Sequence, residues 1–179
     1  PSSSQTVTLT GLNSDGNAVN VTAAFSDNFV CTFTKSSVFT APIACVSEVC
    51  QTYNGTDLPI SISSSGRPTI TSELEVNQEG TIVDVKVKNL MGDHTWVKDL
   101  TAKLISPSGT TITLFDRICN DGEDDFNLNF ADSGEDQTNI TCPPTGGGTY
   151  KVGTGSFADF KDQMATGTWK LEITDGFNQ

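Results

Sequence analysis

Apolar residues alternate with polar ones in a series of short segments, and this alternation constrains the fold more than any other feature of the sequence. It is clearest where Val83, Val85 and Val87 are separated by charged residues. A period of two places every second side chain on the same face of a β-strand. Many short strands of this kind predict an all-β protein, a jelly-roll-like antiparallel β-sandwich with about eight or more strands in residues 57–175. The residues expected to be mainly buried are Leu74, Val83, Val85, Leu100, Leu104, Leu114, Phe130, Trp169 and Leu171.

The composition agrees with a β-fold. The chain of 179 residues contains 25 Thr, 17 Ser, 16 Gly and 12 Asn, which favour strands and turns, whereas residues that favour helices are few. Ser106-Pro107-Ser108-Gly109 has the pattern of a type I turn. Only the segment from Phe157 to Met164 has helical spacing, over about two turns.

The charge of the chain excludes some classes of function. Ten Lys and Arg against 22 Asp and Glu give a formal net charge of −12, which argues against a nucleic-acid partner or an anionic membrane surface. No apolar run approaches the ~20 residues of a membrane span, and no secretory signal peptide opens the sequence. A polar, acidic, Thr-rich chain with several cysteines is typical of a secreted or cell-surface protein.

The chain is expected to have two parts. Residues 1–56 contain short alternating stretches around the turn sequence Asn13-Ser14-Asp15-Gly16, but they have too little bulk for a core. They are interpreted as a β-prone N-terminal extension or as the end of an upstream module. Residues 57–179 carry the sharper alternation and are expected to form the sandwich.

The five cysteines lie outside any Cys-x-x-Cys spacing, which argues against a zinc site and favours disulfides. Cys119 and Cys142 flank the most acidic segment and are the expected pair. Cys45 could pair with Cys50, or Cys31 with either, and the odd number leaves one thiol free or paired outside this chain. Three sequons fit an extracellular protein and predict glycans, although such tripeptides also arise by chance in a Thr-rich chain: Asn20, Asn54 and Asn139.

The sequence from His94 to Thr110, with Leu114-Phe115 after it, resembles the signature of the P domain (P/Homo B domain) of subtilisin/kexin-type proprotein convertases and secreted bacterial peptidases. Three later segments match in order and spacing: Phe130-Ala131-Asp132-Ser133, Phe157-Ala158-Asp159-Phe160 and the run from Gly167 to Asp175. The resemblance covers roughly residues 57–175 and implies a jelly-roll domain that follows a protease catalytic domain. Members of that family usually continue with one more strand, so the final strand is expected to be missing here.

Carboxylates are concentrated between Asp116 and Asp136, where eight acidic residues and one arginine give a net charge of −7. Such crowded carboxylates repel one another unless a hard cation neutralises them, and calcium binds about six to eight oxygen ligands. The spacing does not match an EF-hand loop, so a site would be assembled from separate segments. Asp99 and Asp175 lie at the ends of two matched strands, which suggests a second cluster with Asp132 at one end of the sandwich. The candidate calcium ligands are Asp99, Asp116, Asp121, Asp124, Asp125, Asp132 and Asp175, and the alternative is a solvated acidic surface loop.

The sequence lacks the patterns of a hydrolase. His94 is the only histidine, and a structural or surface role is expected for it because it lies beside a turn that precedes a strand. No Gly-x-Ser-x-Gly or Ser-x-x-Lys motif is present. The chain is therefore predicted to be a non-catalytic, extracellular, calcium-binding module. The resemblance implies that its partner is a protease catalytic domain in the same polypeptide, to whose folding, stability and regulation it contributes.

The main alternative is a structural protein. An incomplete sandwich has an open sheet edge, which a strand of another chain can fill by β-augmentation. Residues 1–56 of one copy could complete the next copy. Head-to-tail donation of this kind would build an extracellular filament or adhesive assembly of identical subunits.

Overall fold

The computed structural model describes residues 50–177, apart from residue 64 and residues 121–123. The chain divides into two compact units, residues 1–50 and 51–179, and the described residues belong almost entirely to the second. Within these ranges no helix is long and apolar enough to cross a membrane.

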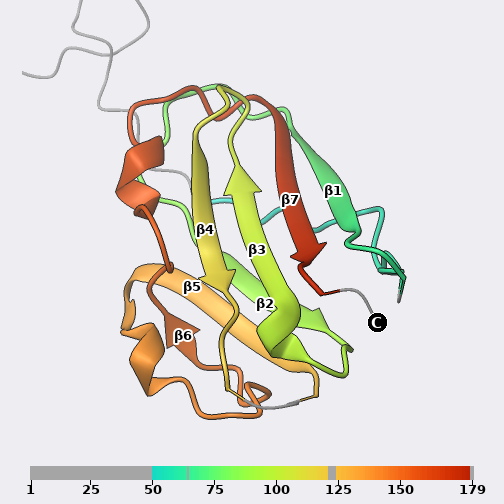
Figure 1. Cartoon of the computed structure of the whole chain (residues 1–179). Helices are drawn as coiled ribbons and strands as arrows, with labels where there is room; N and C mark the ends of the chain where they lie inside the picture. The colour runs from blue at the N-terminus through green and yellow to red at the C-terminus, as the bar shows by residue number, and fades with distance from the viewer. Residues whose placement is uncertain (1–49, 64, 121–123, 178–179) are drawn as a thin grey trace, which may run out of the picture. The chain divides into compact units, whose positions relative to one another are not determined.

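The second unit is built from strands, and its described residues contain no α-helix. The helical segments found there are three short 3-10 helices, so the predicted all-β class is confirmed. In chain order (Figure 1) the elements are β1 (Thr69–Val76), β2 (Val87–Gly92), η1 (Val97–Asp99), β3 (Leu100–Ile105), β4 (Thr111–Asp116), β5 (Phe126–Glu135), η2 (Gln137–Asn139), β6 (Thr149–Tyr150), η3 (Phe157–Phe160) and β7 (Gly167–Asp175).

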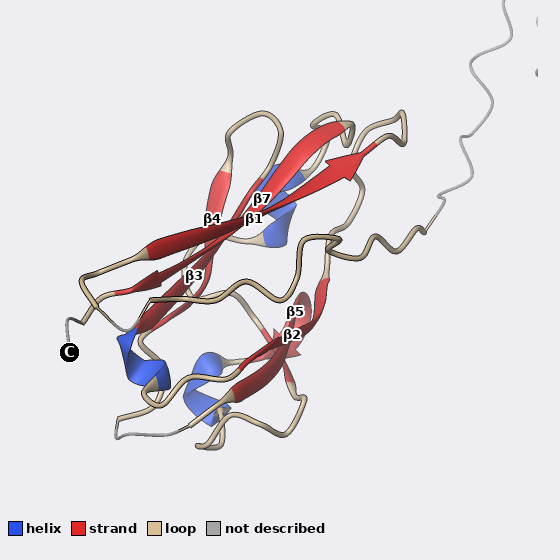
Figure 2. Cartoon of the chain, turned by 90° about the vertical axis from the view of Figure 1, so that its right-hand side faces the viewer, coloured by secondary structure: helices blue, strands red, loops and turns tan. Residues whose placement is uncertain are grey.

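The strands form two open sheets that face each other as the layers of a sandwich (Figure 2). The first sheet has the order β1-β7-β3-β4 with antiparallel neighbours throughout, so β7 lies between β1 and β3. The second has the order β2-β5-β6, in which β2 is antiparallel and the short β6 parallel to β5. The predicted sandwich is confirmed, although its described part has seven strands rather than the expected eight or more.

Aromatic side chains form the centre of the core between the sheets. Phe115 of β4 packs edge-on against Phe126 of β5, with ring centroids 5.6 Å apart, and stacks against Phe130 at 6.3 Å. Phe160 of η3 packs edge-on against Trp169 of β7 at 5.1 Å. Burial of one such side chain contributes about 1.5–3 kcal/mol, so these contacts are a major source of the stability of the sandwich.

Most residues that the alternation placed in the core are found there, but Val83 is 54% exposed and that prediction is wrong. Residues 82–86 are not part of a strand, and β2 begins only at Val87. Ile82 takes the inward position instead, because its N–H donates to the carbonyl of Gln163 and its carbonyl accepts from the N–H of Asp162. The other predicted core residues are buried (Leu100, Leu104, Leu114, Phe130, Trp169) or half-buried against the core (Leu74, Val85, Leu171).

The helical segment that starts at Phe157 is shorter than predicted. Instead of about two turns, the four-residue helix η3 ends at Phe160. A capping box formed by Ser156 and Asp159 fixes its start. It ends early because the N–H of Asp162 donates to the Ile82 carbonyl rather than to a carbonyl within the helix.

Several predictions concern residues outside the described ranges. The turn at residues 13–16, the cysteines Cys31 and Cys45 and the sequon at Asn20 lie there, and strand donation by residues 1–56 rests mainly on the same part of the chain. Cys50 is exposed and has no disulfide partner among the described residues.

Asp57 attaches the segment that precedes the sandwich to the edge strand β1. Its Oδ1 accepts a hydrogen bond from the Ser72 hydroxyl at 2.6 Å, and its Oδ2 accepts one from the Glu73 backbone N–H at 3.1 Å. Both bonds stabilise the charged carboxylate, the Ser72 bond most strongly, and they hold the pKa of Asp57 below its usual value of 3.8.

We expect Asp57→Asn to lower the stability at pH 7, and we expect the difference from the wild type to vanish in acid. Because the pKa of Asp57 is lower in the folded state than in the unfolded state, its contribution is present above pH 3.8 and is lost as the pH falls through the folded-state pKa. Urea unfolding across this range measures the difference. Asp93→Asn, whose exposed carboxylate has no hydrogen bond in the described structure, is the control and should change little at pH 7. A difference that persisted unchanged in strong acid would contradict this account.

Candidate functional site

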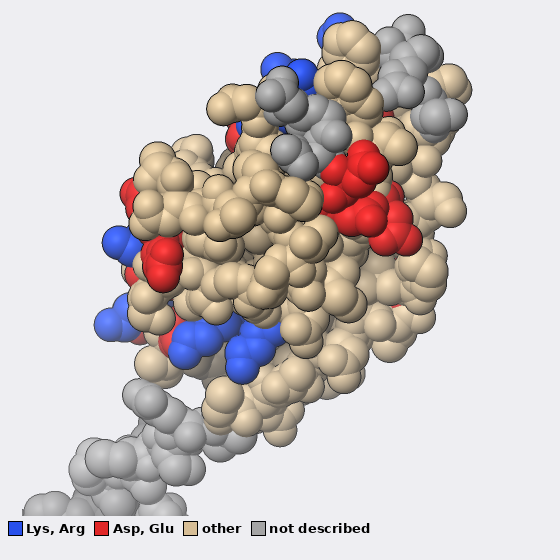
Figure 3. Space-filling model, turned by 90° about the horizontal axis from the view of Figure 1, so that it is seen from below, with Lys and Arg blue, Asp and Glu red and all other residues tan. Residues whose placement is uncertain are grey.

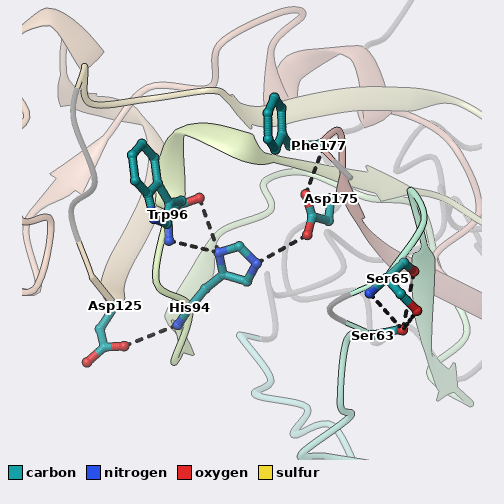
Figure 4. A network of polar contacts seen from close by, with 7 residues as sticks. All are labelled: Ser63, Ser65, His94, Trp96, Asp125, Asp175 and Phe177. Carbon is teal, nitrogen blue, oxygen red and sulfur yellow. Dashed lines mark hydrogen bonds and ion pairs between the residues drawn. The ribbon is translucent and has the colours of Figure 1, made fainter. Parts of the chain in front are cut away.

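A buried carboxylate and the only histidine of the chain meet at the end of the central strand β7 (Figure 4). Asp175, the last residue of β7, is 6% exposed. Its Oδ2 lies 3.4 Å from Nε2 of His94, and its Oδ1 accepts a hydrogen bond from the Phe177 backbone N–H at 2.9 Å. A buried carboxylate is costly unless it is paired or hydrogen-bonded, so these partners explain how the fold tolerates Asp175.

His94 is held on both sides of its ring. Nδ1 lies 3.1 Å from the carbonyl oxygen of Trp96 and 3.2 Å from its backbone nitrogen, while Nε2 faces Asp175. The His94 backbone N–H donates to Oδ1 of Asp125 at 3.1 Å, and its carbonyl accepts from the Asp125 N–H at 3.0 Å. Both ring nitrogens therefore have partners among the described residues.

Two serines drawn in the same view do not complete a catalytic arrangement (Figure 4). Catalysis by a serine nucleophile requires that its hydroxyl hydrogen-bond to a base. The hydroxyl oxygens of Ser63 and Ser65 lie 3.2 Å from each other, and within the described ranges neither bonds His94.

Asp132 is occupied by hydrogen bonds to the start of η3. Its Oδ1 accepts from the Phe157 N–H at 3.0 Å, and its Oδ2 accepts from the Ser156 hydroxyl at 2.9 Å and from the Ala158 N–H at 3.0 Å. The first N–H groups of a helix have no partner within it, and the carboxylate supplies one. Asp132 therefore anchors η3 to β5.

The other candidate calcium ligands do not converge. Asp116 accepts a hydrogen bond from the Thr101 hydroxyl at 2.6 Å, Asp99 lines a pocket with basic side chains, and Asp124 is exposed. Asp121 lies outside the described residues. In the part of the chain that the structure describes, no three His, Cys, Asp or Glu side chains are close enough to hold a metal ion, so Asp99, Asp132 and Asp175 are not brought together.

A disulfide closes the acidic segment. It joins Cys119 to Cys142, the pair favoured by the sequence, across a separation of 23 residues. The enclosed segment contains β5 and η2. Asn139, the last residue of η2, and Asn54 are both exposed, so these two sequons lie at the surface.

Two polar residues that hold loops in place were not identified from the sequence. Asp136 caps η2 by accepting from the Thr138 N–H at 2.9 Å and from its hydroxyl at 2.7 Å, which holds the pKa of Asp136 below its usual value. The Asp-x-Thr spacing is a capping signal that could have identified it. Gln163 gives no such signal: its amide accepts from the Ser106 hydroxyl and donates to Thr110, residues more than 50 positions away.

Comparison with known protein families identifies the proprotein convertase P-domain, whose family model matches residues 82–179, more than half of the chain. The matched range contains β2 to β7 together with His94, Asp132 and Asp175. No curated protein sequence matches the chain.

Among solved structures, the chain is similar to the serine protease of Aeromonas sobria, solved by itself and as a complex with the chaperone. In both cases the identity is 22%, the similarity covers 67% of this chain, and the TM-score is 0.38. The chain spans only 19% of the length of that protease.

Proposed function

Because the chain belongs to the proprotein convertase P-domain family, we propose that it is the non-catalytic accessory domain of a secreted serine protease. Its partner is a catalytic domain in the same polypeptide, whose folding, stability and regulation it supports. The observation that carries this proposal is the family match over residues 82–179, which includes six of the seven described strands.

The polar residues within the matched range support a role without catalysis. Both ring nitrogens of His94 have partners, and the carboxylates of Asp132 and Asp175 accept hydrogen bonds that hold η3 and the end of β7. These contacts support the proposal, because each of the three side chains holds a part of the fold in place.

Secretion is supported by the disulfide and by the sequons. Disulfides persist in oxidising compartments, and the Cys119–Cys142 bond closes a segment rich in mutually repelling carboxylates. Asn54 and Asn139 lie at the surface, where glycans attach.

Deletion of residues 51–179 from the complete reading frame should lower the yield of active secreted protease by about tenfold or more, because a bound partner domain stabilises the folded state. The yield is measured by active-site titration of the culture medium. Phe115→Ala, which removes a side chain from the core, should act in the same direction, whereas the exposed Lys161→Gln should not. An unchanged yield after deletion, or a reading frame without a catalytic domain, would contradict the proposal.

We also propose that calcium binds the acidic segment between Asp116 and Asp136. Its support is the net charge of −7 on this segment. Since the described carboxylates do not converge and Asp121 lies outside the described residues, no ligand geometry is assigned. Calcium bound there would neutralise carboxylates that otherwise repel one another.

Melting temperatures in excess calcium and in chelator test the calcium site. Calcium should raise the melting temperature by binding the folded state, and Asp124→Asn should reduce that rise. Asp132→Ala is the contrasting variant: it should lower the free energy of unfolding by about 1–2 kcal/mol in both buffers, because it removes the acceptor of η3. Equal melting temperatures in the two buffers would leave a solvated acidic loop as the correct interpretation.

A further inference from the structure

A pocket of about 520 Å³ opens beside the end of β7, and most of the charged side chains that line it are basic. The chain has only two arginines, and both line this pocket together with Lys98. The chain carries a net charge of −12, so a pocket lined by three cations has the opposite sign to the molecule as a whole. The lining residues are Arg67, Lys98, Asp99, Arg117, Gly176 and Phe177.

The backbone places the guanidinium of Arg117 against Gly176. Arg117 follows β4 with a φ of +50°, and its N–H donates to the Leu100 carbonyl at 2.9 Å. The Gly176 N–H donates to the Asp99 carbonyl at 2.8 Å, which fixes the chain that follows β7. A Cβ added to Gly176 would lie 2.7 Å from an Nη atom of Arg117, so a residue with a side chain would displace the guanidinium.

The cations of the pocket are not neutralised by ion pairs. Within the described residues, the ion pairs involve other side chains, and neither arginine has a carboxylate within 4 Å. Nζ of Lys98 lies 4.6 Å from the centroid of the Trp96 ring and 3.5 Å from the carbonyl oxygen of Asn120. With Asp99 as the single lining carboxylate, three positive charges and one negative charge leave a local charge of +2.

We propose that this pocket binds carboxylate side chains presented by an extended segment of a partner protein. A guanidinium binds a carboxylate through two parallel N–H···O hydrogen bonds, and two such groups suit a segment with two acidic residues. Phe177 is 57% exposed and offers an apolar contact to a side chain between them. The partner segment is therefore acidic and contains an adjacent apolar residue.

The charge of the whole molecule favours such a segment over a polyanion. A polyanion would extend beyond the pocket and would be repelled by the excess carboxylates of the chain. A segment with one or two carboxylates would interact mainly with the pocket, because charges farther away than the Debye length of about 8–10 Å are screened. Figure 3 shows one face of the molecule, on which the largest group of acidic side chains contains no Lys or Arg, whereas smaller acidic groups lie next to basic side chains.

Titration of the full chain with two synthetic peptides tests the site. The peptides are acetyl-Glu-Leu-Glu-amide and its neutral counterpart acetyl-Gln-Leu-Gln-amide. In NMR spectra of nitrogen-labelled protein the arginine Nε–H region contains one signal for each of the two arginines. We expect the Glu peptide to shift both signals, to bind about tenfold more tightly than the Gln peptide, and to weaken as salt is added.

Arg117→Gln should weaken binding of the Glu peptide by about tenfold, and Gly176→Ala should weaken it by displacing the guanidinium. Lys161→Gln, an exposed lysine outside the pocket, is the matched control and should leave binding unchanged. If Arg117→Gln fails to fold, Lys98→Gln is tested in its place, and it should also weaken binding of the Glu peptide. Absent binding, equal binding of the two peptides, or equal losses in the control would overturn the proposal. Inorganic sulfate that binds as tightly at matched ionic strength would overturn the assignment to a peptide.

Discussion

Asp175 is a buried carboxylate at the end of the central strand, and the arrangement of that end of the sandwich depends on how its charge is satisfied. His94 and the Phe177 N–H contact its two oxygens, while its own N–H donates to the carbonyl of Pro68 just before β1. One residue thus ties together β7, the start of β1 and the loop before η1. The same contacts position Gly176, against which the guanidinium of Arg117 lies, so the basic pocket depends on them as well.

The acidic residues that stand out in the sequence serve the fold in several places. Asp132 anchors η3, Asp116 accepts from the Thr101 hydroxyl across the β3–β4 pair, and Asp175 holds the end of β7. A sandwich with open sheets and many loops has backbone N–H groups that no neighbouring strand satisfies, and carboxylates are strong acceptors for them. These acidic side chains therefore hold loops and strand ends of the sandwich in place.

The sequence predicts the strands well where one face is covered by the opposite sheet, as in β5, because burial of one face enforces the alternation from Phe126 to Phe130. The alternation gives the wrong prediction at Val83, because hydrogen bonds between Ile82 and the loop after η3 place the Ile82 side chain inward instead. The pocket was not predictable, because Arg67, Lys98 and Arg117 come from three separate segments that only the strand register brings together. Turns and helix caps can be predicted because their signals lie within a few consecutive residues, whereas contacts between distant segments cannot.

A double-mutant cycle tests most directly whether His94 and Asp175 act together to hold the end of β7. Free energies of unfolding in urea are measured for the wild type, His94→Gln, Asp175→Asn and the double variant. We expect each single change to cost about 1–3 kcal/mol and the double change to cost little more than one of them, which gives a coupling energy of about 1 kcal/mol or more. Losses that simply add would contradict the account, because they would show that the two side chains stabilise the sandwich independently.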